Sequence, residues 1–148
     1  LSVERSLRRL KTDYIDMVLV HSDGNDADII HNSAALQTLA DLKQRGWIRA
    51  FGMSTKTVEG GLLAAAQSDV VMVTYNLNER DDVAVLDYCR DHRKGVLIKK
   101  ALASGHRCDG DAVAEALAMI FAHAGTSAAI VGTINPGHLR DNVGKLPL

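Results

Sequence analysis

Five short apolar runs alternate with longer amphipathic segments along the chain, and this alternation restricts the fold more than any other feature. The runs are rich in β-branched residues and almost continuously apolar, which is typical of parallel strands covered by helices. Repeated βα units on a parallel sheet, in a single domain over residues 1–148, are therefore expected. The expected strands lie at 14–20, 48–53, 70–77, 96–102 and 128–132.

The segments between and around these runs carry apolar residues at helical spacing. Gly46, Gly95 and Gly125 follow such segments and are predicted to close helices. Asn135 is predicted to cap the last helix, with Pro136 in its first turn. The expected helices lie near 2–10, 33–45, 57–67, 81–93, 111–124 and 136–143.

Two architectures accommodate about five βα units: an open doubly wound sheet, and the larger part of an eight-stranded barrel. No GxGxxG turn follows the first expected strand. Its absence speaks weakly against a dinucleotide-binding open sheet, because the phosphate needs close backbone approach at that turn. The composition alone leaves both architectures open.

The charge balance argues against several classes of partner. The 17 Lys and Arg residues oppose 18 Asp and Glu, so no basic surface for nucleic acid or an anionic membrane is expected. No apolar stretch reaches the ~20 residues that span a bilayer. Cys89 and Cys108 form no CxxC pair and suit a reducing compartment, so a cytoplasmic protein is expected. The histidines form no HxH or HxxxH pair, and no metal site is expected.

His21 is the first candidate functional residue. It directly follows the apolar run at 14–20, and parallel α/β proteins carry their chemistry where strands open into loops. A histidine that only ends the strand and bonds a nearby carbonyl is the simpler interpretation. The pattern by itself leaves both readings open.

Two blocks of sequence resemble the aldo-keto reductases. Residues 6–24 match the family's fourth-strand region, and residues 39–54 match the segment from its fourth helix to its fifth strand. The stretches at 74–80, 95–105 and 128–143 look like its later strand ends. The matching residues of the two blocks are Leu7, Leu10, Thr12, Asp13, Tyr14, Asp16 and His21, and Leu42, Gly46, Ile48, Arg49, Gly52 and Ser54.

This resemblance implies strands four to eight of a parallel (β/α)8 TIM-type barrel, without strands one to three. It also implies a nicotinamide cofactor, NADP or NAD, and the reduction of small aldehydes or ketones to alcohols. Of the family's Asp-Tyr-Lys-His tetrad only His21 is present, where it would orient the substrate carbonyl. The parent protein is therefore expected to be an oxidoreductase, and this chain alone to be inactive.

Some of the family's cofactor-binding positions match this sequence, and others hold a different residue. Ser54 matches the serine that binds the nicotinamide carboxamide, but Thr55 and Met72 replace the usual amides, and Lys99 replaces an aromatic residue that stacks on the ring. The remaining positions would contact the pyrophosphate and the adenosine. They are Leu102, Ser104, Gly105, Gly132, Thr133, Asn135, His138, Asp141 and Asn142. Because His138 stands where many members have arginine, the choice between NADP and NAD stays open.

Two other functions remain as alternatives. Lys99 or Lys100, at a strand end, could form a Schiff base as in aldolase-type barrels. The chain could instead be a non-catalytic, nucleotide-binding half-barrel. Such a half-barrel exposes two strand edges and an apolar inner face, so self-association through these edges is expected.

Overall fold

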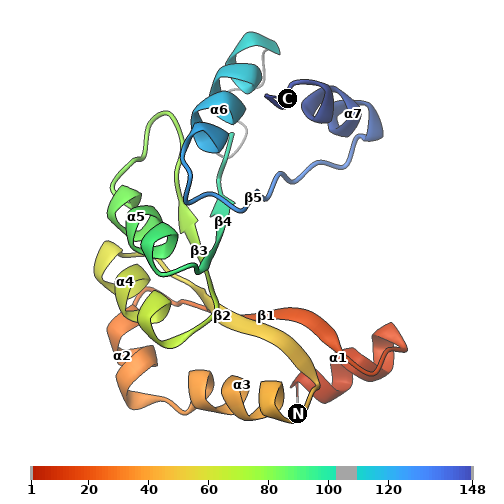
Figure 1. Cartoon of the computed structure of the whole chain (residues 1–148). Coiled ribbons are helices and arrows are strands. Elements are labelled where there is room, and N and C mark those ends of the chain that lie inside the picture. Colours follow the sequence, from red (N-terminus) through yellow and green to blue (C-terminus); the bar gives the residue numbers. More distant parts are fainter. Residues whose placement is uncertain (1, 103–109, 148) are drawn as a thin grey trace.

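The structure is a computed structural model that describes residues 2–102 and 110–147 (Figure 1). In these residues helices and strands alternate as expected. In chain order they are α1 (Ser2–Leu10), β1 (Ile15–His21), α2 (Asp26–Asn32), α3 (Ala35–Gln44), β2 (Ile48–Ser54), α4 (Val58–Gln67), β3 (Val70–Thr74), α5 (Val83–Asp91), β4 (Gly95–Lys99), α6 (Gly110–Ala122), β5 (Ala128–Ala129) and α7 (Pro136–Gly144).

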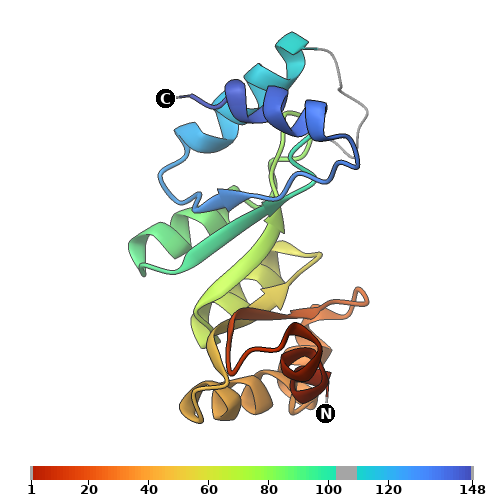
Figure 2. The ribbon, with the colours of Figure 1, turned by 90° about the vertical axis from the view of Figure 1, so that its right-hand side faces the viewer.

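The five strands form one parallel sheet in which each strand pairs with the next along the chain, in the order β1-β2-β3-β4-β5. The sheet curves, with α2 to α5 on its convex side and its concave side open between α1 and α7 (Figure 1). Figure 2 shows the same succession of strands from the side. A doubly wound sheet would reverse the strand order, so the sequential order favours the barrel. The fold is therefore an incomplete (β/α)8-type barrel, as expected.

The core lies between the convex face and the helices. Met53, Val71, Val73 and Ile98 are fully buried and pack with Leu86 of α5 in one hydrophobic cluster. Side chains alternate between the two faces of a strand, so their neighbours in sequence face the concave side.

The concave face is apolar and less covered. Met17 on β1 is 39% exposed and Ile130, just after β5, is 50% exposed. In a closed barrel this face is the packed interior, which explains why its residues are apolar. Self-association through the strand edges stays a prediction.

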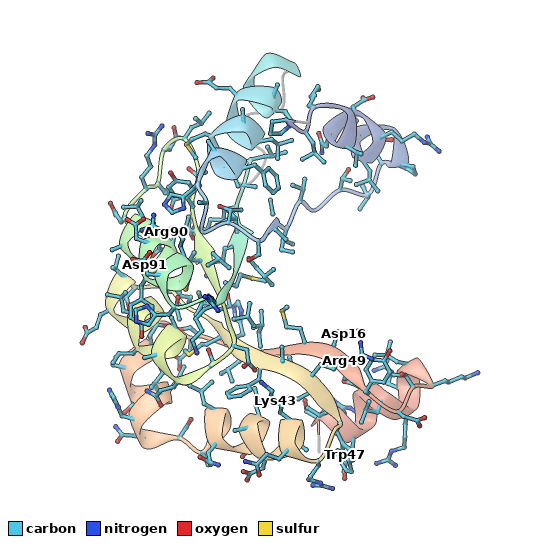
Figure 3. The ribbon with its side chains drawn as sticks, in the orientation of Figure 1. Asp16, Lys43, Trp47, Arg49, Arg90 and Asp91 are labelled. Atoms are coloured by element: carbon cyan, nitrogen blue, oxygen red, sulfur yellow. The ribbon has the colours of Figure 1, made fainter. Side chains whose placement is uncertain are left out.

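Charged pairs lie at the periphery (Figure 3). Arg49 Nη1 lies 3.1 Å from Asp16 Oδ1, and Lys43 Nζ lies 2.6 Å from an Asp69 carboxylate oxygen. Arg90 contacts Asp91 on the outside of α5. Because these side chains are largely exposed to solvent, which screens their charges, such pairs contribute little to stability.

All five expected strands are present, but three of them end earlier, among them the fifth, which stops at Ala129 instead of residue 132. The third stops at Thr74, because the side chain of Asn76 accepts hydrogen bonds from the amides of Asn78 and Glu79 and so makes a turn. The fourth stops at Lys99, where Lys100 adopts a left-handed φ of 53°.

The helix predictions hold except in three places. The short helix α2 was not expected, because its seven residues show too little periodicity. Gly95 begins β4 instead of closing a helix, and Arg93 takes the left-handed conformation after α5, with φ of 55°. Gly125 has no positive φ and instead packs against the Leu86 carbonyl. Gly46, with φ of 76°, closes α3 as predicted.

Arg93 and Gly46 both adopt a left-handed backbone conformation, and replacing each of them measures how much this conformation destabilises a residue other than glycine. Arg93→Gly should raise the free energy of unfolding by about 0.5–1 kcal/mol, since glycine adopts positive φ without strain. Gly46→Ala should lower it by about 1 kcal/mol, because a Cβ there meets no atom within 4 Å and only the backbone is strained. Urea denaturation measures both changes, and a loss of stability in Arg93→Gly would contradict the prediction.

None of the helices in the part of the chain that the structure describes is long and apolar enough to cross a membrane. Within those residues there is also no group of three or more His, Cys, Asp or Glu side chains that could hold a metal ion.

Candidate functional site

A cavity of about 600 Å³ opens at the carboxyl ends of the strands. His21 ends β1, Thr74 ends β3 and Lys99 ends β4, and all three line this cavity. We refer to it as the strand-end cavity. His21 is exposed and pairs in register with Ser54 at the end of β2. The structure thus places His21 where the sequence predicted, at the mouth of the sheet.

Lys99 links the ends of β4 and β2. Its Nζ donates hydrogen bonds to Ser54 Oγ, at 3.2 Å, and to the carbonyl oxygen of Thr55. Because β3 lies between these strands, the lysine side chain crosses the end of β3 on the concave side. Burial lowers the pKa of Lys99, whereas nearby Asp82 acts in the opposite direction. The ammonium therefore occupies the place where Ser54 was expected to meet the cofactor.

Thr55 is not among the described residues that line the strand-end cavity. The side chain is buried, and a Cβ on Gly61 of α4 would lie 3.5 Å from its Oγ1. This oxygen has no hydrogen-bond partner among the described residues. A direct contact between the Thr55 hydroxyl and a nicotinamide amide is not favoured by this placement.

The sequence analysis did not single out Asp82, whose carboxyl group lines the strand-end cavity. One of its oxygens accepts a hydrogen bond from the backbone amide of Thr74, at 3.0 Å. Burial raises the pKa of Asp82, while the Thr74 amide and the charge of Lys99 act in the opposite direction. Asp82 thereby anchors the end of β3 beside Lys99.

Asp26 is the second residue that sequence reasoning missed. It lies in the first turn of α2 and is only 2% exposed. Its Oδ2 accepts hydrogen bonds from the backbone amides of Lys56 and Thr57, at 2.9 and 2.8 Å, and from the Thr57 hydroxyl, at 2.7 Å. Asp26 thereby ties the segment that follows His21 to the start of α4.

A glycine allows this contact. A side chain at Gly60 would overlap Asp26, because the first turn of α4 approaches the carboxyl group so closely. Two adjacent glycines, Gly60 and Gly61, are unfavourable inside a helix unless another segment packs against them. This pair was the one signal in the sequence that could have indicated the approach of Asp26.

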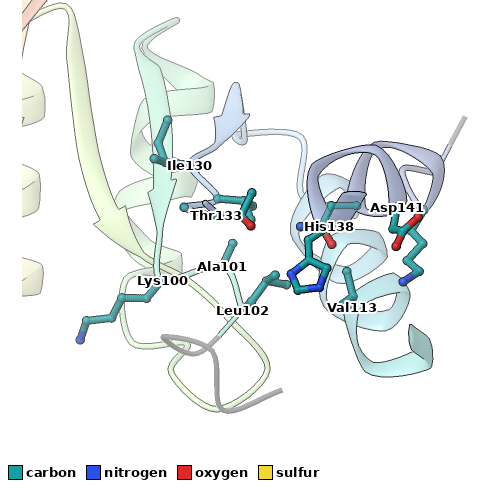
Figure 4. Close-up of a pocket in the computed structure, with 12 residues that line it drawn as sticks. Lys100, Ala101, Leu102, Val113, Ile130, Thr133, His138 and Asp141 are labelled. Atoms are coloured by element: carbon teal, nitrogen blue, oxygen red, sulfur yellow. The ribbon is translucent and has the colours of Figure 1, made fainter. Parts of the chain in front are cut away.

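A second cavity, of about 510 Å³, lies between the residues that follow β4, helix α6, the segment after β5 and one side of α7 (Figure 4). We refer to it as the α7 cavity. Six of the predicted cofactor residues line it: Leu102, Gly132, Thr133, His138, Asp141 and Asn142. Open space surrounds Gly132, where a Cβ would meet nothing within 4 Å, so a ligand can approach the backbone.

The remaining predicted residues fall elsewhere. The side chain of Asn135 caps α7 by accepting a hydrogen bond from the Gly137 amide, at 2.8 Å, as the sequence predicted for the helix. Ser104 and Gly105 lie outside the residues that the structure describes. Lys100 lines both cavities, which makes them neighbours.

A curved parallel sheet with sequential strands, outer helices and polar side chains at the carboxyl ends of the strands defines the class of (β/α)8-barrel proteins. Comparison with known proteins makes the assignment more specific. The chain belongs to the aldo/keto reductase family, whose model matches residues 1–112. The resemblance drawn from the sequence motifs is thereby confirmed at the level of the family.

Three relatives illustrate the match. Aldo-keto reductase YhdN of Bacillus subtilis is 35% identical over 106 residues, which cover 70% of this chain and 31% of that protein. A crystal structure from Pseudomonas aeruginosa, assigned to the aldo-keto reductases, is 56% identical with a TM-score of 0.91, covering 97% of this chain and 55% of that one. An aldo/keto reductase from Klebsiella pneumoniae, in complex with NADP and acetate, is 26% identical with a TM-score of 0.72, over 99% and 58%.

The chain is shorter than the relatives that it matches and spans only part of their length. It covers about a third of YhdN and just over half of the Pseudomonas protein.

Proposed function

We propose that the chain forms part of an NAD(P)H-dependent oxidoreductase that reduces small aldehydes or ketones to alcohols. The observation that carries this proposal is the adjacency of the two cavities, joined at Lys100. A dinucleotide has two ends, and here the backbone after β5 with one side of α7 would serve one end, while strand-end polar groups would serve the other. The NADP in the Klebsiella relative agrees with such a ligand.

The residues of the α7 cavity fit the adenosine half of the cofactor. The backbone around Gly132 and Thr133, which lines the cavity, offers amide donors to phosphate. His138, Asp141 and Asn142 offer polar groups for the ribose and its substituents. Leu102 lies next to the His138 ring and gives the cavity an apolar wall (Figure 4).

The strand-end cavity would hold the nicotinamide and the substrate carbonyl. When bound, the cofactor supplies a hydride. His21 can donate a hydrogen bond to the carbonyl oxygen and so favour the charge that develops on it. The tyrosine, lysine and aspartate of the family tetrad have no counterpart in these five βα units, so we expect the chain to bind nucleotide without turnover.

The Schiff-base alternative is less well supported. Lys99 Nζ is held by two oxygen acceptors within the fold, although burial lowers its pKa in the direction that a nucleophilic amine needs. Lys100 points to the surface and pairs with Glu79, at 3.6 Å. Borohydride trapping with a carbonyl compound would label a lysine only if this alternative held.

A cytoplasmic location remains part of the proposal, supported by the state of Cys89. Its thiol is free and buried, and burial raises its pKa to about 11, so it is a packing residue and not a reactive one.

Fluorescence titration of the chain with NADPH and NADH tests this function directly. Saturable binding is expected, and His138→Arg should raise the preference for NADPH over NADH about tenfold, because a guanidinium is permanently charged and binds phosphate with two donors. Arg140→Ala, on the same helix but not lining the cavity, is the matched control. If neither nucleotide binds, the proposal is wrong.

A further inference from the structure

Lys99 places a positive charge at the point where the nicotinamide ring would lie. Its Nζ is bonded to Ser54 Oγ and to the Thr55 carbonyl, on the concave side of the sheet. It lines the same cavity as His21, so the ammonium and the imidazole face a common space. A ligand bound against Ser54 would therefore contact or displace this ammonium.

Other charged groups line the cavity as well, and Asp82 lies close enough to Lys99 to offset part of its charge. The three lysines Lys56, Lys99 and Lys100 are matched in number by the three carboxyl groups of Glu79, Asp81 and Asp82. The Glu79 carboxylate pairs with Lys100, and Asp82 accepts from the Thr74 amide. The cavity therefore has no large net charge, and the charge bonded to Ser54 is the one nearest to the ring.

The two redox forms of the cofactor differ in the charge of the nicotinamide ring. The oxidised nicotinamide ring carries a positive charge, whereas the dihydronicotinamide ring of NADPH is neutral. Two like charges a few ångströms apart in a partly buried site repel each other by an amount that water screens only in part. An ammonium beside the ring thus acts on one form and hardly on the other.

Building on the proposed function, we propose that Lys99 makes the site discriminate between the redox forms, so that it binds NADPH more tightly than NADP⁺. The half-reaction is NADP⁺ + H⁺ + 2e⁻ → NADPH, and tighter binding of the reduced form raises the potential of the bound couple. A tenfold difference in affinity corresponds to about 30 mV for two electrons. The bound cofactor becomes a slightly weaker hydride donor, and NADP⁺ leaves more readily after the reaction.

Titrations of the full chain with NADPH, by fluorescence, and with NADP⁺, by calorimetry, test this inference. The wild type should bind NADPH about tenfold more tightly. Lys99→Met, which removes the charge but keeps an unbranched chain, should tighten NADP⁺ about tenfold and change NADPH by less than about threefold. Lys99→Arg should keep the preference, because it keeps the charge.

Two controls separate this effect from general ones. Lys43→Met removes a lysine that pairs with Asp69 far from the strand ends, and it should leave the preference unchanged. Adenosine 2′,5′-bisphosphate lacks the nicotinamide and should bind wild type and Lys99→Met equally. If its binding changed in Lys99→Met, the residue would be acting through folding, and the inference would be wrong.

The outcomes distinguish the two proposals. If both nucleotides bind and Lys99→Met leaves their affinity ratio unchanged, the redox discrimination is overturned while the nicotinamide site stands. If neither binds, the proposed function fails and the inference fails with it.

Discussion

Replacing Asp26 by alanine is expected to lower the free energy of unfolding by about 3 kcal/mol. The substitution leaves two backbone amides and the Thr57 hydroxyl without their acceptor at the start of α4. Asp28, on the same helix, is exposed and accepts only from Asn32 among the described residues, so Asp28→Ala should cost less than about 0.5 kcal/mol. Urea denaturation followed by circular dichroism measures both variants, and equal effects would contradict the role of Asp26.

The contribution of Asp26 should also depend on pH. Burial raises its pKa, but the nearby Ser22 side chain and the hydrogen bonds from Thr57 and the two backbone amides outweigh burial, so the pKa lies below its ordinary value of 3.8. A carboxyl group with a lowered folded-state pKa stabilises the fold above its unfolded pKa. The stability difference between wild type and Asp26→Asn should therefore be constant down to about pH 5 and shrink below about pH 4. A difference that grew on acidification would contradict this assignment.

The same contact matters for the site. Asp26 fixes the segment after His21 against the segment after Ser54, and these two residues end neighbouring strands. In Asp26→Ala we expect the two segments to move relative to each other even where the sheet survives. Asp26 is therefore a positioning residue for the strand-end cavity.

Replacing Gly52 by alanine is expected to have the largest effect, a loss of more than about 4 kcal/mol. A Cβ at this position would overlap the backbone carbonyl oxygen of Val70, where β2 pairs with β3. Backbone atoms cannot rotate away as a flexible side chain can, so the two strands must separate locally. Thermal unfolding and the yield of soluble protein report the effect.

Gly144 is the matched control for Gly52. It ends α7, and a Cβ there meets nothing within 4 Å, so Gly144→Ala should change stability by less than about 1 kcal/mol. If Gly52→Ala unfolded at the same temperature as Gly144→Ala, the close approach of β2 and β3 would be refuted.

Local patterns account for what could be predicted well. The five strands, the placement of His21 at a strand end and the Asn135 cap of α7 each depend on a few neighbouring residues. Where such patterns were weak, the predictions failed. The short helix α2 has too few residues to show a period, and Gly95 was assigned to a helix end although it begins a strand.

The sequence by itself determined the class of fold. Apolar strands that alternate with amphipathic helices leave few arrangements in which the strands and the apolar faces of the helices are all buried. Only the tertiary structure decided what the polar groups do. Lys99 reaches Ser54 across 45 residues, and Asp26 reaches Lys56 across 30, because the register of the parallel strands and the path of the loops bring these ends together. Hydrogen bonds of this kind depend on which strands are neighbours, and no local spacing of residues encodes that.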